Sequence, residues 1–152
     1  MKDIKKTLFA TDFSDISATA QEHAVFLRDH LDCELEVVHV FDPDTFNMPT
    51  PYYFMPGVET WLDEHIATMK EKGDTALKDL IEKIAPCTGT FLEGKTGESI
   101  CKHALETDCD MIVMGTHGHT GFNRLIMGSV AEYVVRHAHC SVLTIKPKQG
   151  DS

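Results

Sequence analysis

The chain has no long apolar run and comparatively few basic residues. No stretch of about eighteen consecutive apolar residues occurs, so we expect no transmembrane helix. Residues 1–6 carry lysines but no apolar segment ahead of a cleavage site, so we expect no signal peptide. Lys and Arg number 14 against 24 Asp and Glu, and the formal net charge of −10 argues against nucleic acid as the main partner.

Cysteine and histidine patterns typical of disulfide or metal sites are also missing. The five cysteines are odd in number and lack such spacing, so reduced thiols in a cytoplasmic protein are the simplest interpretation. Several residues that could bind a metal lie close together, but their spacing matches no standard zinc pattern: His117, His119, His137, His139 and Cys140. His137 and His139 fall at the end of a predicted helix, where a histidine interacts well with the helix dipole. We expect no dedicated metal site.

Familiar catalytic patterns do not occur either. The sequence contains no nucleophile elbow, no Ser-Gly-Gly-x-Asp-Ser loop after the first predicted strand, and no acidic pair with metal-binding spacing. These absences favour a protein that binds its ligand over an enzyme with rapid turnover.

A segment with several glycines, residues 115–129, is the most distinctive stretch that is present. It follows an apolar run that predicts a buried strand, Asp110–Met114, and precedes apolar residues at helical spacing, Val130–Ala138. Open α/β sheets bind ligands at such connections between a strand and a helix. Gly115 and Gly118 would let the backbone approach a ligand closely.

The end of this segment has the features of an anion site. Gly128 and Ser129 would begin the following helix and direct unpaired N–H groups and a hydroxyl at an anion. The segment contains neither the Gly-Lys-[Ser/Thr] of a Walker A loop nor G-x-G-x-x-G, and its spacing is G-x2-G-x9-G-S. An ordinary turn followed by a helix cap is the alternative explanation of these glycines.

Apolar periodicity predicts a regular alternation of strands and helices. Strands are expected at Ile4–Ala10, Glu34–Val40, Thr88–Glu93, Asp110–Met114 and Ser141–Pro147. Helices are expected after Ser14, over Val58–Ala85, from Thr96 or Gly97, and from Gly128, and their apolar stripes include Leu31 and Leu105. The alternation predicts a single α/β domain over residues 1–148, with an open five-stranded parallel sheet, helices on both faces and a short tail at 149–152.

The segment Phe41–Gly57 differs in composition from the rest of the chain. It holds four of the six prolines and several aromatic residues. Its proline content argues against a helix or a central strand, and its aromatic content argues against free disorder. We expect a loop packed on its own domain, with a lid or a partner contact as the alternative.

The glycine spacing, the start of the chain and its last strand together resemble the ATP-binding branch of the universal stress protein family. In that family the first strand leads into an acidic residue and a small polar turn, as in Leu8–Ser14, and the last strand matches Ser141–Pro147. The resemblance covers essentially the whole chain. It implies a Rossmann-like fold with strand order 3-2-1-4-5, bound ATP with Mg²⁺ or Mn²⁺ carried by the phosphates, and a homodimer formed through Ser141–Ile145.

The resemblance also implies which residues form the nucleotide site. Asp12 would contact the adenine or the ribose, and the backbone of Val40 would contact the adenine edge. Ser129, Arg124 and His117 would act on the phosphates. The implied site comprises Ala10, Thr11, Asp12, Val40, Met114, Gly115, His117, Gly118, Arg124, Gly128, Ser129 and Val130. A helix-capping role for Asp12 and a solvated surface position for Arg124 are the alternatives.

Three other functions stay open at this point. A slow ATPase would use a water near Ser129 and the metal ion, and an interaction protein would leave the pocket empty. A signalling receiver domain also has five parallel strands, an Asp after the first strand and a Lys at the fifth, here Lys146. That class needs an acceptor Asp after the third strand, where this chain offers Glu93, so the receiver interpretation is poor.

Overall fold

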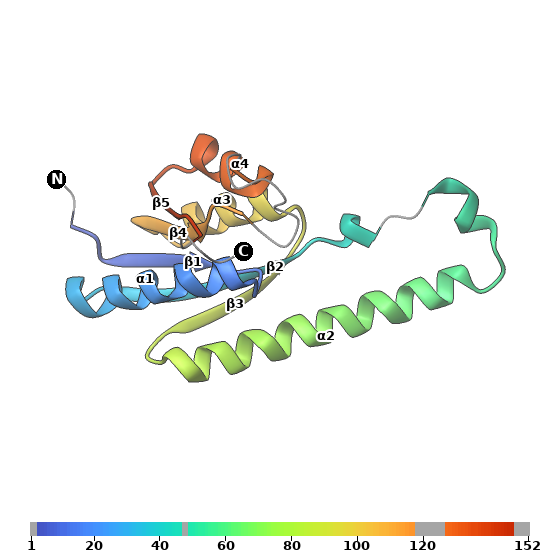
Figure 1. Cartoon of the computed structure of the whole chain (residues 1–152), viewed down its shortest axis with the longest axis horizontal. Helices are drawn as coiled ribbons and strands as arrows, with labels where there is room; N and C mark the ends of the chain where they lie inside the picture. Colours follow the sequence, from blue (N-terminus) through green and yellow to red (C-terminus); the bar gives the residue numbers. More distant parts are fainter. Residues whose placement is uncertain (1–2, 47–48, 118–126, 148–152) are drawn as a thin grey trace.

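The fold is a five-stranded parallel sheet with helices on both faces (Figure 1). The computed structural model describes residues 3–46, 49–117 and 127–147. The strands are β1 (Lys6–Ala10), β2 (Glu34–Phe41), β3 (Thr88–Glu93), β4 (Met111–Gly115) and β5 (Ser141–Ile145). They are ordered β3-β2-β1-β4-β5, as the family resemblance implied, and every neighbouring pair is parallel.

Each strand is joined to the next by a helical connection. The four α-helices are α1 (Asp15–Leu31), α2 (Val58–Ile84), α3 (Thr96–Glu106) and α4 (Ser129–His137). Two short 3-10 helices, η1 (Pro43–Phe46) and η2 (Thr50–Phe54), lie between β2 and α2. The predicted alternation of strands and helices is therefore confirmed.

The core consists of one apolar layer on each face of the sheet. Because successive strand residues point to opposite faces, Leu8 packs in the layer under α3 and α4, whereas Phe9 packs in the layer under α1 and α2. Both side chains are fully buried. The expectation that Leu31 and Leu105 belong to the core is wrong, because they are 44% and 61% exposed. Each lies in the last turn of its helix, beyond the packed part of the apolar stripe.

Helix α2 is longer than the strands that it covers. Its 27 residues extend about 40 Å at 1.5 Å per residue, whereas the eight residues of β2 span about 26 Å. Its carboxyl-terminal half packs on the sheet through Leu77 and Ile84. Residues 49–69, called the arm here, extend away from the sheet (Figure 1).

The expectation of a loop packed on its own domain is only partly correct. Phe46 stacks on Phe41, with ring centroids 5.6 Å apart, so the beginning of the segment does pack against the end of β2. Tyr52, Phe54 and Met55 are more than half exposed, and they lie on the arm. The aromatic residues of the segment therefore divide into a packed group near the sheet and an exposed group far from it.

Candidate functional site

The topology brings three strand ends together at the carboxyl edge of the sheet. β1 pairs with β2 as far as Ala10 and Val38, and with β4 as far as Phe9 and Val113. The chain winds outward from β1 through β2 to β3, and then outward through β4 to β5 on the other side. The boundary between β1 and β4 is thus the switch point, where open α/β sheets bind ligands. The predicted site residues follow or flank these strands.

Thr11 leaves β1 and fixes the turn that follows. Its N–H donates to the Val38 carbonyl at 3.0 Å, and its hydroxyl lies 2.6 Å from the Ser17 hydroxyl. The same hydroxyl accepts a hydrogen bond from the Phe13 N–H at 3.0 Å. The Thr11 side chain is buried and its hydroxyl already has partners within the protein. It would therefore line a site without donating a hydrogen bond to the ligand.

Asp12 and Phe13 complete this turn. One carboxylate oxygen of Asp12 accepts from the Ser14 N–H at 3.0 Å, while Ser14 itself caps α1 by accepting from the Ser17 N–H at 3.3 Å. Phe13 has a φ of 62°, a left-handed conformation that is sterically unfavourable for a bulky residue. Such residues cluster at functional sites. Asp12 therefore has a structural role, and its carboxylate is held at the switch point by a specifically shaped turn.

His39 is a residue that sequence reasoning missed. Its Nδ1 donates to the Thr11 carbonyl at 2.9 Å, and its ring packs on Phe13 at 4.5 Å and on Phe91 at 5.6 Å. Burial lowers the pKa of His39, opposed by this hydrogen bond and by the negative charge of Asp12. The only signal in the sequence is a histidine inside the apolar run of β2. His39 stabilises the turn that contains Asp12 through its hydrogen bond to the Thr11 carbonyl.

Val40 contributes its backbone at the same edge. The Val38 carbonyl faces β1, because it accepts from Thr11, and the Phe41 carbonyl faces β3, because it accepts from the Gly94 N–H at 3.0 Å. Residues two apart in a parallel strand bond toward the same neighbour, so the N–H and C=O of Val40 face the side of β1. They lie beyond Ala10, the last residue of β1. This orientation fits the predicted contact with an adenine edge.

The ends of the glycine segment are tied together. The Thr116 N–H donates to the Ile145 carbonyl at 2.9 Å, and the Gly128 N–H donates to the Thr116 carbonyl at 2.7 Å. His117 is buried, and its Nδ1 lies 2.8 Å from the Thr116 hydroxyl. Gly118 and Arg124, two of the predicted site residues, lie outside the described residues.

In the structure, Gly115 and Gly128 have a packing role that the sequence did not suggest. A Cβ on Gly115 would lie 2.8 Å from Cγ2 of Ile16 on α1, and a Cβ on Gly128 would lie 3.1 Å from the Thr116 carbonyl oxygen. Gly115 is therefore required for α1 to pack closely on β4. Close approach to a ligand is not needed to explain these two positions.

Helix α4 begins where the sequence predicted. Gly128 is its N-cap and supplies no side-chain cap, and Ser129 is the first helical residue. The first N–H groups of a helix have no partner within the helix and carry partial positive charge. Ser129 is exposed and Val130 is half-buried, whereas the side chains of Ala10 and Met114 are buried in the α3/α4 layer. Ala10 and Met114 would thus contribute only backbone to a site.

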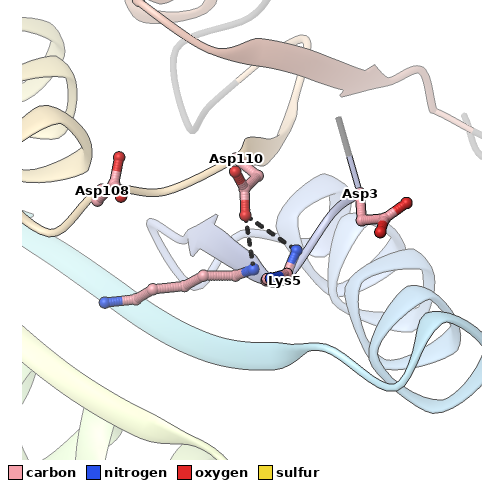
Figure 2. A pocket seen from close by; sticks show the side chains of 5 residues that line it. Asp3, Lys5, Asp108 and Asp110 are labelled. Carbon is pink, nitrogen blue, oxygen red and sulfur yellow. Dashed lines mark hydrogen bonds between the residues drawn. The ribbon is translucent and has the colours of Figure 1, made fainter. Parts of the chain in front are cut away.

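A cavity of about 440 Å³ lies at the opposite edge of the sheet, where β1 and β4 begin (Figure 2). It is lined by Asp3, Lys5, Lys6, Asp108 and Asp110. Oδ2 of Asp110 accepts from the backbone N–H groups of Lys5 and Lys6 at 2.9 and 3.0 Å, so this carboxylate joins the starts of the two strands. Because this carboxylate is used to tie the two strand starts together, we assign Asp110 a structural role.

A Walker A pattern does occur elsewhere in the chain, and sequence reasoning overlooked it. Gly89–Thr96 matches G-x-x-x-x-G-K-[ST]. The first glycine is paired with Val37 inside β3, and the strand continues to Glu93, so these residues are extended and cannot curl around a phosphate. The pattern is therefore a coincidence of composition.

Among residues 3–46, 49–117 and 127–147, no three His, Cys, Asp or Glu side chains lie close enough to hold a metal ion, while His119 falls outside these ranges. No helix in the same ranges is long and apolar enough to cross a membrane.

Comparison with known proteins supports one family. The universal stress protein family matches residues 3–146. The chain is 38% identical to the universal stress protein MJ0531 of Methanocaldococcus jannaschii, and the match covers 95% of this chain and 84% of that protein.

Solved structures are similar over almost the whole chain. The structure of MJ0577, also from Methanocaldococcus jannaschii, has a TM-score of 0.80 at 25% identity and covers 98% of this chain and 100% of that one. The universal stress protein from Archaeoglobus fulgidus, solved in complex with dAMP, has a TM-score of 0.59 at 23% identity and covers 95% of this chain and 100% of that one. The sequence match and the shared fold agree, and this chain belongs to the universal stress protein family.

Proposed function

We propose that this universal stress protein binds ATP at the carboxyl edge of β1, β2 and β4. The observation that carries the proposal is the meeting of three features at the switch point: the strained turn with Asp12, the Val40 backbone that faces the side of β1, and the start of α4 at Ser129. A bound nucleotide would contact each of these features. The complex of the Archaeoglobus fulgidus relative with dAMP supports an adenine nucleotide as the ligand.

Each part of ATP has a matching group in this arrangement. The N–H and C=O of Val40 would pair with the adenine edge, and the carboxylate of Asp12 would accept from the ribose hydroxyls. The N–H groups at the start of α4 and the Ser129 hydroxyl would donate to the phosphates. Hydrogen bonds to charged groups contribute roughly 1.5–3 kcal/mol each, so a few of them with adenine burial can give a micromolar dissociation constant.

The phosphates would bring a Mg²⁺ or Mn²⁺ ion with them. The ion would supply charge neutralisation, since both ions prefer phosphate and water oxygens. Asp12 is the acidic residue of the proposed site; one of its carboxylate oxygens accepts from the Ser14 N–H, and the carboxylate is assigned to the ribose hydroxyls. The ion is therefore assigned to the ligand and not to a protein cage.

We further propose that the protein acts by binding and not by rapid hydrolysis, as a cytoplasmic homodimer. The five cysteines are free thiols, which suits a reducing compartment. Among the described residues, β5 is the last strand of the sheet and pairs with β4 alone, and a terminal strand rich in β-branched residues can pair with a second copy. Occupancy by ATP would then alter the partners of the dimer.

One experiment tests the ligand and the alternative of an ATPase together. Freshly purified protein is denatured, and the released small molecules are identified by mass spectrometry. Release of ATP supports the proposal, while release of a different class of molecule contradicts it. Phosphate release is then measured with added ATP and Mg²⁺, and multiple turnovers per minute would favour the ATPase.

A further inference from the structure

The outer part of the arm carries the densest group of exposed apolar side chains in the described chain. Phe54 is 83% exposed, Met55 55%, Tyr52 52% and Trp61 51%, and Tyr53 is also exposed. These five residues, called the arm tip here, lie within ten positions, on η2, at its C-cap and in the first turn of α2. Exposed apolar patches of this kind mark interaction sites, and aromatic residues dominate the energetics of such sites.

The arm tip has a defined shape. The Val58 N–H donates to the Met55 carbonyl and the Trp61 N–H to the Gly57 carbonyl, so the tip continues directly into α2. The Trp61 ring stacks on His65 with centroids 5.2 Å apart, and His65 meets the edge of the Phe46 ring at 5.6 Å. Since Phe46 in turn stacks on Phe41 at the end of β2, a row of rings joins the tip to the sheet.

The charge around the tip has one sign. The arm, residues 49–69, contains no Lys or Arg, and it includes three acidic residues: Glu59, Asp63 and Glu64. All three are exposed. The surface therefore repels nucleic acid, anionic membranes and a second copy of itself.

These features select one kind of partner. An apolar surface with an acidic rim is complementary to a segment that has apolar side chains on one face and Lys or Arg beside them. Lys and Arg also bind the faces of aromatic rings. We propose that the arm tip is a docking surface for a basic amphipathic segment of a partner protein. This site lies outside the proposed nucleotide site and does not depend on it.

The experiment uses Trp61, the one tryptophan of the chain, as the reporter. The probe is a synthetic amphipathic peptide of lysine and leucine without aromatic residues, and its control is the same peptide with glutamate in place of lysine. The lysine peptide should shift the Trp61 emission to shorter wavelength in a saturable, salt-sensitive manner, because it removes water from the ring. The glutamate peptide should have no effect.

Matched variants distinguish docking at the tip from attraction to an acidic protein. Phe54→Ser should weaken binding roughly tenfold or more, whereas Phe26→Ser, which removes a 57% exposed ring on α1, should leave it unchanged. Glu59→Lys with Asp63→Lys should abolish binding, whereas Asp79→Lys with Glu82→Lys, on the other half of α2, should weaken it only slightly. Circular dichroism confirms that each variant is folded.

Several results would overturn the proposal. If both charge-reversal pairs weaken binding of the lysine peptide equally, net charge alone attracts the peptide. A shift of the emission with protein concentration, removed by Phe54→Ser, would identify a second copy as the occupant. A shift with ATP alone would identify the arm tip as a lid on the protein's own ligand, and a shift with phosphatidylglycerol vesicles would identify a membrane.

Discussion

Substituting Gly115 by alanine should destabilise the protein, because α1 leaves no space for a methyl group. The added Cβ would lie 2.8 Å from Cγ2 of Ile16, a distance that real Cβ atoms essentially never show. Ile16 cannot swing this methyl away easily, since a β-branched side chain has one strongly preferred rotamer in a helix. Overpacking of this kind costs about 1–3 kcal/mol. Urea unfolding followed by circular dichroism, at fixed protein concentration, measures the loss.

A second substitution tests whether Ile16 is the cause. In an Ile16→Ala background the methyl group has room, and Gly115→Ala should then be neutral or stabilising by about 0.4–1 kcal/mol through reduced freedom of the unfolded chain. The double-mutant cycle should therefore show a coupling of at least about 1 kcal/mol. Equal effects of Gly115→Ala in both backgrounds would refute the packing explanation and would favour ligand approach as the reason for this glycine.

Two further predictions concern pH and assembly. The free energy of unfolding should fall as pH drops below 6.5, because the pKa of His39 is lower in the folded protein and the unfolded chain therefore binds a proton at this histidine more readily. His39→Gln should flatten this decline. An unchanged slope would mean that His39 is not its cause. The free energy of unfolding should fall further below pH 4.5, because of Glu36: burial raises its pKa, but the contacts with Lys6, His103 and Thr90 together outweigh burial and hold the pKa below its usual value. Glu36→Gln should remove this second decline in the same urea titrations. Val142→Arg should yield monomers in light scattering, because a charge on β5 opposes pairing of the strand with a second copy, and a dimer that persists at low concentration would place the interface elsewhere.

The sequence predicted the elements of this fold well because their signals are local. Apolar periodicity located the five strands and the four α-helices of the described chain to within a few residues, but not the short helices η1 and η2; the chemistry of Ser14 and Gly128 indicated where α1 and α4 begin. The strand order followed from the family resemblance and not from periodicity. The length of α2 could have predicted the arm, because a helix of 27 residues is longer than strands of at most eight residues and must extend beyond the sheet.

The candidate site was less predictable because its details depend on residues far apart in sequence. His39 acts on the Thr11 carbonyl, 28 positions away, and nothing in its local sequence indicates this contact. Gly115 is explained by Ile16 on a different element, whereas sequence reasoning assigned the glycine to a ligand. The left-handed conformation of Phe13 was also invisible, since phenylalanine has no preference for it.

Calorimetric titration of ATP and Mg²⁺ into the protein and two variants of Ser129 tests the central claim most directly. Ser129 is preferable to Gly128 as the target, because any side chain at Gly128 would also press on the Thr116 carbonyl. Ser129→Glu places a carboxylate beside the phosphates, yet Glu is favourable in the first turn of a helix, so this variant should stay folded. The parent should bind ATP with a micromolar dissociation constant. The dissociation constant should rise by at most roughly tenfold in Ser129→Gln, and by at least about a hundredfold in Ser129→Glu. If folded Ser129→Glu binds ATP as tightly as the parent, the phosphates do not lie at the start of α4, and the proposed site is wrong.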